Sequence, residues 1–247
     1  MATNGWTSLR VLVAALLMIG AAACTGSSES TSTNSTSTIS SSTSPPTSAS
    51  PAAEGISFGP FGTSPSVTVV AALPKGWVDD SDFGAMSGPD PASMEAPTGS
   101  GILFFTVDGL YSNPCRWDVA GTGAADKGDV GVGTTVDDLV AALGKNTFYT
   151  STEPAPVTID GYAGQELEIQ LPDDPFTNCD VEPGDSSGHA YVFPLNVYVQ
   201  GPANIWHLSV LDVDGTRLVA AILSYQGTPK AELDDARNVI ATMDIQV

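Results

Sequence analysis

Two aspartates near the C-terminal end of the chain have the spacing of a catalytic pair. Asp212 and Asp214 lie in LDVDGT, residues 211–216. Carboxylates can act as nucleophiles and as general acids or bases, so this pair is a candidate for hydrolytic chemistry. The same residues also fit a turn. Asp214 and Gly215 lie between two apolar segments, and Asp-Gly readily supplies the positive backbone angles of a tight hairpin.

The LDVDGT segment resembles the first motif of haloacid-dehalogenase-type phosphatases, which would make Asp212 the nucleophile and Asp214 the acid/base. In that family the motif ends the first strand of a parallel sheet, and a lysine and a second acidic pair follow much later. Here 31 residues follow Thr216. We therefore expect a hairpin, and a secreted hydrolase that uses Asp212 and Asp214 is the alternative.

A serine offers a second possible nucleophile. Ser186 lies in GDSSG, residues 184–188, which fits G-x-S-x-G and resembles the GDSGG of serine proteases. A nucleophile elbow needs a strand before it and a helix after it, and neither flank fits. Both histidines, His189 and His207, follow the serine. We expect an acidic loop here, with a Ser186 hydrolase as the alternative, and a hydrogen-bonded core role for His207.

The beginning of the chain has the composition of a secretory signal. Arg10 precedes the apolar segment VLVAALLMIG, and small residues follow. The apolar segment is shorter than the roughly 20 residues that span a bilayer. Because Cys24 comes directly after the small residues, residues 1–23 resemble a bacterial lipoprotein signal, although Ala21 stands where that family usually has leucine. The resemblance implies that Cys24 is acylated, and that the membrane is a partner through this anchor.

The other two cysteines, Cys115 and Cys179, form an even pair in a chain with an export signal. Disulfides persist outside the cytoplasm, so we expect these residues to be joined. The alternatives are a metal site or a catalytic thiol, but neither cysteine has a CxxC partner or a histidine at ligand spacing. The sequence therefore predicts no metal and no cofactor.

The charge balance limits the possible partners. Without residues 1–23, which contain Arg10 and no acid, the chain has 7 basic and 28 acidic residues and a net charge of −21. Such a surface repels phosphate backbones, so we expect no nucleic-acid partner. It also repels anionic lipid headgroups, so a membrane link would depend on the acyl chains. The expected location is the extracytoplasmic face of the cell membrane, in the cell envelope.

Residues 24–55 are mostly serine and threonine, with Ile39 as the one large apolar residue, and cannot bury a core. They predict a disordered tether, followed by a single globular domain at residues 56–247. In that domain the pattern predicts strands and helices separated by Gly- and Asp-rich loops, including a long loop at 79–100. The expected strands cover 67–73, 102–107 and 190–200, with one hairpin of 157–160 and 165–171 around Asp160-Gly161 and a second of 205–213 and 216–225 around Asp214-Gly215. The expected helices cover 136–143, which Thr135 caps and Gly144 ends, and the segment that Thr228 caps. This order favours an α+β domain with an antiparallel β-sheet packed by helices.

Several segments together resemble exported actinobacterial lipoproteins of uncharacterised activity. They are LPKGW at 73–77, NPCRWD at 113–118, TTVDDLVAAL at 134–143, VTIDGYAGQELEI at 157–169 and WHLSVLDVDGTR at 206–217. A weaker similarity, in an early strand ending in P-x-GW and in the hairpin patterns, is to the LpqN-type lipoproteins with a PsbP/Mog1-like fold. This resemblance implies an α–β–α sandwich and a binding or accessory role.

The first functional hypothesis is therefore a non-catalytic binding or accessory lipoprotein with an unknown small-molecule or protein ligand. It predicts a pocket or patch lined by aromatic side chains such as Trp77, Trp117, Tyr162 and Trp206, without converging polar groups. The alternatives are the secreted hydrolase described above and a structural spacer in the cell wall, which would have no pocket.

Overall fold

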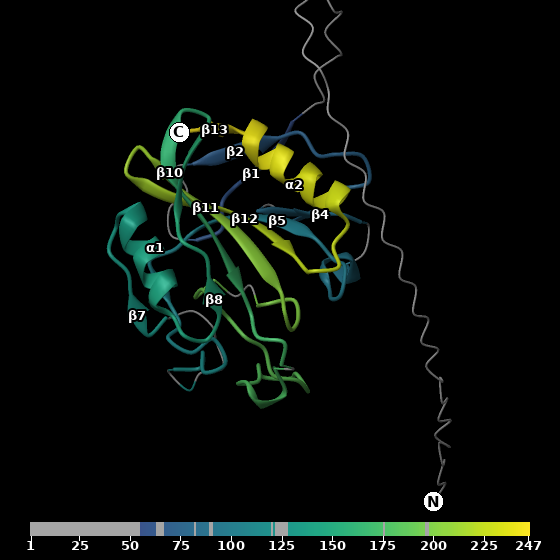
Figure 1. Cartoon of the computed structure of the whole chain (residues 1–247), viewed down its shortest axis with the longest axis vertical. Coiled ribbons are helices and arrows are strands. Elements are labelled where there is room, and N and C mark those ends of the chain that lie inside the picture. The colour runs from purple at the N-terminus through teal and green to yellow at the C-terminus, as the bar shows by residue number, and fades with distance from the viewer. Residues whose placement is uncertain are drawn as a thin grey trace, which may run out of the picture. The chain divides into compact units, whose positions relative to one another are not determined.

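An eight-stranded antiparallel sheet organises the computed structural model shown in Figure 1. The structure describes residues 55–62, 67–81, 83–88, 91–119, 121, 128–174, 176–195 and 198–247. The predicted signal, the predicted acylation site Cys24 and nearly all of the predicted tether lie outside these residues.

The sheet has the strand order β3-β4-β5-β12-β11-β10-β8, and β9 pairs with β10 beside β8. The bounds of its strands are β3 Val78–Ser81, β4 Gly84–Met86, β5 Gly101–Thr106, β8 Thr150–Ser151, β9 Ala155–Ile159, β10 Tyr162–Gln170, β11 Ile205–Val213 and β12 Thr216–Ser224.

Smaller elements surround this sheet. A three-stranded sheet joins β1, β2 and β13, and a two-stranded sheet joins β6 and β7. The bounds are β1 Ile56–Phe58, β2 Thr68–Ala71, β6 Gly109–Leu110, β7 Val130–Gly131, β13 Asp244–Gln246, α1 Val136–Lys145 and α2 Lys230–Thr242, with 3₁₀ turns at Pro91–Met94 and Phe176–Asn178.

Both faces of the central strands are buried, and each face carries a helix. Along β12, Val219 and Leu223 belong to the core cluster that includes residues of α1. The alternate residues Ala220 and Ile222 belong to the cluster that includes residues of α2. Figure 1 shows the two helices on opposite sides of the sheet. The predicted α+β fold with helix–sheet–helix layers is therefore confirmed.

The two hairpins that the sequence predicts are present. Asp160 has φ 49° and Gly161 has φ 82°, and in the second hairpin Asp214 has φ 49° and Gly215 has φ 85°. These angles fit the two-residue turn whose twist matches the flanking strands. Each turn fixes the register of its hairpin, so β9 pairs with β10 and β11 pairs with β12.

The first helix begins as predicted but ends later. The Thr135 hydroxyl accepts from the Asp138 N–H at 3.1 Å, and the Asp138 carboxylate accepts from the Thr135 N–H at 3.1 Å, which completes a capping box. The predicted stop at Gly144 is wrong, because the helix runs to Lys145. Its last turn closes at Asn146, whose N–H donates to the Leu143 carbonyl at 3.2 Å.

Three other expectations are wrong, each because tertiary contacts override the local pattern. The described residues of the predicted strand at 190–200, which are 190–195 and 198–200, form no strand, because their backbone bonds to other loops; the Tyr191 N–H, for example, donates to the Pro114 carbonyl at 2.9 Å. Part of the predicted 79–100 loop forms β3 and β4, which extend the sheet beyond β5. Thr228 does not cap α2, because its hydroxyl donates instead to the Gly99 carbonyl at 2.9 Å.

The predicted disulfide joins Cys115 and Cys179, whose Cα atoms are 4.3 Å apart. The Asp180 N–H donates to the Cys115 carbonyl at 2.9 Å, and Arg116 pairs with the Asp180 carboxylate at 2.9 Å. The bond and these contacts hold two distant loops together.

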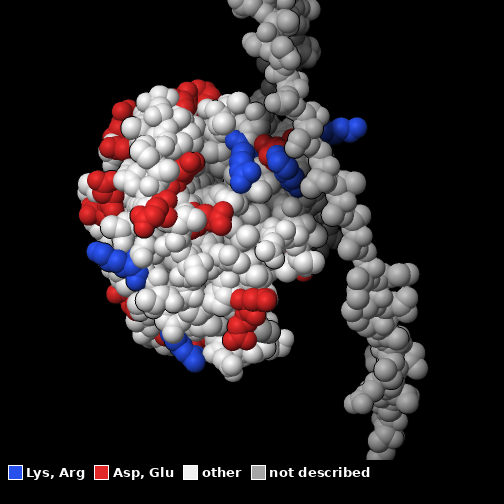
Figure 2. Space-filling model, in the orientation of Figure 1, with Lys and Arg blue, Asp and Glu red and all other residues white. Residues whose placement is uncertain are grey.

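On the face of the molecule that Figure 2 shows, acidic side chains are spread over the surface rather than gathered in one patch.

One buried cation joins several elements. The Arg217 side chain on β12 donates to three backbone carbonyls, those of Val107, Gly133 and Thr135. Arg217 is 7% exposed, so these carbonyls would have few alternative donors. The guanidinium therefore ties the end of β5 and the start of α1 to the centre of the sheet.

We predict that Arg217→Lys lowers the free energy of unfolding by about 2 kcal/mol, because an ammonium cannot reproduce the planar fork that reaches carbonyls in three directions. Urea denaturation followed by circular dichroism measures this. Arg116→Lys is the matched control, since its ion pair is largely exposed, and we expect a change below about 0.5 kcal/mol. Equal stability of the two variants would contradict the role of Arg217.

Candidate functional site

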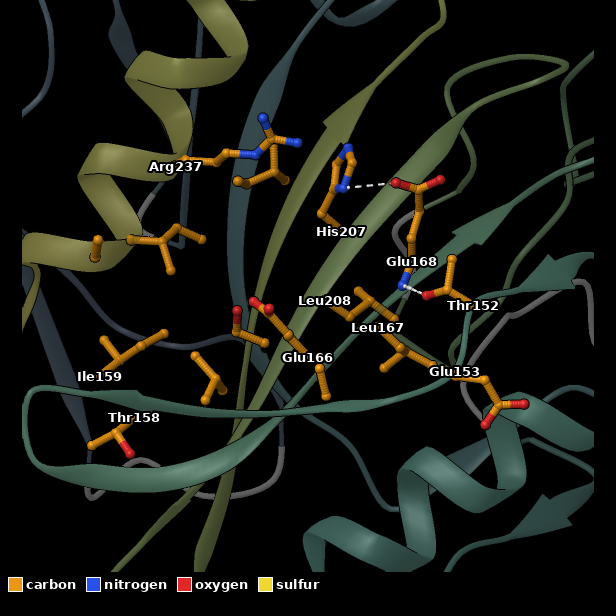
Figure 3. Close-up of a pocket in the computed structure, with 16 residues that line it drawn as sticks. Thr152, Glu153, Thr158, Ile159, Glu166, Leu167, Glu168, His207, Leu208 and Arg237 are labelled. Carbon is orange, nitrogen blue, oxygen red and sulfur yellow. Dashed lines mark hydrogen bonds and ion pairs between the residues drawn. The ribbon is translucent and has the colours of Figure 1, made fainter. Parts of the chain in front are cut away.

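A groove of about 520 Å³ opens on the α2 face of the sheet. Its floor comes from β10 and β11, α2 borders one side, and β9 with the residues before it borders another (Figure 3). The groove exists because α2 packs on β12, β2 and β9 but leaves the neighbouring face of β10 uncovered. Along β10, Leu167 and Ile169 are buried in the α1-side core, so Glu166 and Glu168 face the groove.

A chain of hydrogen bonds crosses the floor of the groove. Glu168 lies directly opposite His207 in the strand register, and the Glu168 Oε2 to His207 Nδ1 distance is 3.0 Å. The other ring nitrogen, Nε2, lies 3.2 Å from the Ser224 hydroxyl on β12. The Glu168 N–H also donates to the Thr152 hydroxyl at 2.9 Å. Both the imidazole and the carboxylate are therefore held in fixed orientations.

The environment of His207 favours its neutral form. Burial lowers the pKa of His207, the Glu168 carboxylate raises it, the positive charge of Arg237 lowers it, and the net direction is down. A neutral ring can donate from Nδ1 to the Glu168 carboxylate and accept at Nε2 from the Ser224 hydroxyl. The prediction that His207 is hydrogen-bonded is confirmed, but it lines the groove rather than lying in the core.

The connectivity of Glu168, His207 and Ser224 is that of an acid–histidine–serine relay. A serine nucleophile must be reachable by a carbonyl carbon, however, and Ser224 is 1% exposed in the middle of the sheet. In this geometry the serine and the glutamate orient the histidine from its two sides. The relay therefore gives the groove a fixed polar floor.

The opposite part of the groove is apolar. Ile159, Ile222 and Ile240 come from three different elements and present a wall beside Glu166. Each is at most 6% exposed, because the side chains also pack in the α2-side core. Arg237 borders the groove from α2, and its ion pair with Asp234 is long, at 3.9 Å. The groove thus combines an apolar wall, a hydrogen-bonded floor and charged groups, as small-molecule sites commonly do.

The aspartates that the sequence singled out lie elsewhere, at the hairpin between β11 and β12. The Asp212 carboxylate accepts from the Gly215 N–H at 2.8 Å, and Asp214 occupies the turn with a positive φ. The predicted hairpin therefore accounts for both residues, and neither lines the groove.

The predicted serine nucleophile lies in an exposed loop. Ser186 is in a segment without helix or strand, as the loop interpretation predicts. In the same loop, His189 Nε2 lies 2.8 Å from the Asp185 carboxylate. Within the residues that the structure describes, no three His, Cys, Asp or Glu side chains are grouped to hold a metal ion.

The predicted pocket or patch lined by aromatic side chains, without converging polar groups, is wrong, because polar side chains converge in the groove. Trp77, Trp117 and Trp206 are buried in the core, Tyr162 packs against the α2-side core, and none of the four lines the groove. Large aromatic side chains contribute most when their whole surface is buried, and Trp117 also donates from Nε1 to the His189 carbonyl at 2.9 Å.

Sequence reasoning missed Glu166, Glu168, Ser224 and Arg237. The available signal was the alternation in QELEIQL, residues 165–171, which leaves the two glutamates on the wet face. Their neighbours across the sheet depend on a strand pairing that this alternation does not specify.

The fold and the groove together define an α+β sandwich domain with a cleft beside its C-terminal helix. No protein-family model matches the chain, and no curated protein matches it. In the described part of the chain, no helix has the length and apolar character needed to cross a membrane.

Two solved structures show a distant likeness. One is LpqN, involved in cell envelope biogenesis of Mycobacterium tuberculosis, with 14% identity over 74% of this chain and 85% of that chain and a TM-score of 0.38. The other, from Bacteroides thetaiotaomicron VPI-5482, has 11% identity over 79% of this chain and 49% of that chain and a TM-score of 0.31. Both scores are too low to support an argument about this protein.

We predict that the His207 ring titrates below its ordinary value of about 6.5, with shifts of opposite sign in two variants. Arg237→Gln should raise the His207 pKa, because it removes a positive charge, and Glu168→Gln should lower it further. The His207 ring protons in an NMR titration report both shifts. Asp235→Asn, another charge change on α2, should have a much smaller effect, and shifts of the same sign in the first two variants would contradict the assignment.

The same shift links stability to pH. Below about pH 6.5 the unfolded chain binds a proton on His207 more readily than the folded chain does. The contribution of His207 to the free energy of unfolding is therefore complete above that pH and declines on acidification. We expect His207→Gln to reduce the loss of unfolding free energy between pH 7.5 and 5.5, measured by urea denaturation. An unchanged pH dependence would contradict the prediction.

Proposed function

We propose that this chain is a lipid-anchored, extracytoplasmic binding protein of the cell envelope with a non-catalytic or accessory role. The groove beside α2 would be its ligand site. The observation that carries the proposal is the groove itself. Its volume of about 520 Å³ lies within the usual range of small-molecule sites, and its polar floor is fixed before any ligand arrives.

The proposed location rests on the sequence and on the disulfide. The signal-like residues 1–23, Cys24 and the Ser/Thr-rich segment 24–55 would place the domain on a tether outside the membrane. A disulfide between Cys115 and Cys179 suits an oxidising compartment. The net charge of −21 beyond the signal suits a protein held to the membrane by acyl chains rather than by a basic surface.

A binding role agrees better with the groove than a catalytic one. Both ring nitrogens of His207 are engaged by protein groups, so neither is placed to exchange a proton with a ligand. The serine that completes the relay is buried, and Asp212, Asp214 and Ser186 lie outside the groove. A spacer in the cell wall would need no such groove, which favours binding over that alternative as well.

The anchor is tested by the intact mass of the protein purified from its native membrane. We expect a mass that begins at Cys24 and includes acyl chains, with Cys115 and Cys179 alkylated only after reduction. The Cys24→Ser variant should lack the acyl mass and leave the membrane fraction. A wild-type mass without acyl chains would overturn the lipoprotein proposal.

The ligand site is tested by what the protein retains on purification. We expect organic extraction followed by mass spectrometry to find a small molecule that is enriched with the wild type and lost from Ala241→Trp, because Ala241 is an exposed groove residue on α2. The matched control is Asn238→Trp, on the same helix but outside the groove, which should retain the molecule. Equal retention by the two variants, or no enrichment with the wild type, would contradict the proposal.

A further inference from the structure

We propose that the groove beside α2 takes an organic ammonium ion that carries an apolar substituent. This inference rests on the proposed function, since it names the class of ligand for the same groove. The structural basis is the combination of carboxylates on the β10 side with an aliphatic wall below α2.

The first argument is the charge balance within the groove. Glu153, Glu166 and Glu168 line it, whereas Arg237 is its one lysine or arginine side chain. Since His207 favours its neutral form, the groove has an excess of negative charge. Figure 3 shows Glu166 and Glu168 on β10, with the Glu168 carboxylate turned toward His207 and the Glu166 carboxylate turned away from it, and Arg237 reaching in from α2. A cationic ligand would reduce the repulsion between the two glutamates, and an anionic ligand would increase it.

The second argument is the hydrogen-bonding geometry of the floor. Glu166 and Glu168 occupy alternate positions of one strand, about 6.6 Å apart along the backbone. Their partners across the sheet are Ser209 and His207. An ammonium group has three N–H donors and forms bonds of about 2.8 Å to carboxylates, so it can bind either glutamate. The Ser209 hydroxyl, which also lines the groove, offers a third acceptor.

The third argument is that the Glu168 carboxylate is already oriented. His207 holds Oε2 at 3.0 Å, and the Thr152 hydroxyl fixes the backbone of the same residue. A carboxylate oriented before binding loses little conformational freedom when a ligand arrives. Among the residues that the structure describes, none forms a hydrogen bond or ion pair with the Glu166 side chain, which is exposed and lines the same groove as the apolar wall.

The apolar wall gives the substituent its place. Ile159, Ile222 and Ile240, which form the wall, line the same groove as Glu166, so a ligand whose nitrogen meets the carboxylate can place its carbon chain against these side chains. Each methylene removed from water there contributes about 0.8 kcal/mol when it is fully buried. A small hydrophilic amine would leave this wall unused, and a neutral alcohol would leave the carboxylates without a counterion.

Two sources present this chemistry, free alkylamines and the headgroups of aminolipids. The experiment uses the chain from residue 24 onward with Cys24→Ser, which contains every described residue and carries no acyl group. Isothermal titration calorimetry at low ionic strength compares n-octylammonium, n-octanol and octanoate at submicellar concentrations. We expect n-octylammonium to bind at least about tenfold more tightly than the other two, with an affinity that falls as salt is added.

Variants that are expected to change the affinity for n-octylammonium in opposite directions make the test specific to the groove. Glu166→Gln and Glu168→Gln should each weaken n-octylammonium binding several-fold, whereas Asp235→Asn, with the same charge change outside the groove, should alter it less than about twofold. Arg237→Gln should strengthen binding about threefold, because it removes a like charge, and Lys230→Gln is its matched control. Circular dichroism confirms that each variant is folded.

Flotation with phosphatidylglycerol vesicles that contain or lack phosphatidylethanolamine separates the two sources. Flotation that requires phosphatidylethanolamine and disappears in Glu168→Gln assigns the ammonium to a lipid headgroup. Binding of n-octylammonium without such flotation assigns it to free amines, and either result supports the inference.

The inference is overturned if n-octanol or octanoate binds as tightly as n-octylammonium, if Glu168→Gln and Asp235→Asn have equal effects, or if no probe binds. Its failure is distinguishable from failure of the proposed function. If n-octanol binds and Ala241→Trp abolishes that binding, the groove is a binding site without a preference for ammonium ions. Retention of a native ligand on purification is measured in a separate experiment.

Discussion

The structure depends on a sheet whose central strands are apolar on both faces. β12 sends alternate residues into two separate cores, so neither face can be left in water. A helix must therefore cover each side, and α1 and α2 do so. One helix is narrower than the sheet, however, and α2 covers β12 but not the adjoining face of β10. The groove lies over the part of this sheet face that α2 does not cover, and it is polar because β10 alternates between apolar and charged residues.

This arrangement places polar side chains beside the α2-side core rather than inside it. His207 is partly desolvated by its position next to α2, which lowers its pKa, and it is satisfied by one partner on each neighbouring strand. The three side chains belong to β10, β11 and β12, so the register of the sheet fixes their geometry. A mobile loop could not hold a histidine between a carboxylate and a hydroxyl with comparable precision. The rigidity of the sheet thus makes the groove a preformed site.

The parts of the fold that depend on residues close in sequence were predictable, because the tertiary contacts there agree with the local preferences. The Asp-Gly turns and the capping box at Thr135 depend on residues close in sequence, and the structure contains them. The errors occurred where distant partners decided the outcome. Residues 190–200 have apolar residues typical of a strand, but the loop that carries Cys115 offers their backbone other hydrogen-bond partners. β3 and β4 have weak strand signals and form because β5 supplies an edge.

The α+β class, the two hairpins and the pairing of the two cysteines beyond the signal-like segment follow from the sequence alone, because periodicity, turn chemistry and cysteine count act over short range or by elimination. The helix–sheet–helix layers were an implication of the resemblance. The location of the candidate site, by contrast, depends on the tertiary structure. Glu168, His207 and Ser224 are far apart in the chain and meet because three strands pair in one register. Arg237 joins them through the packing of α2. Periodicity shows which face a residue occupies but not which residues of other strands lie beside it, so a site assembled across a sheet emerges only once the strands are paired.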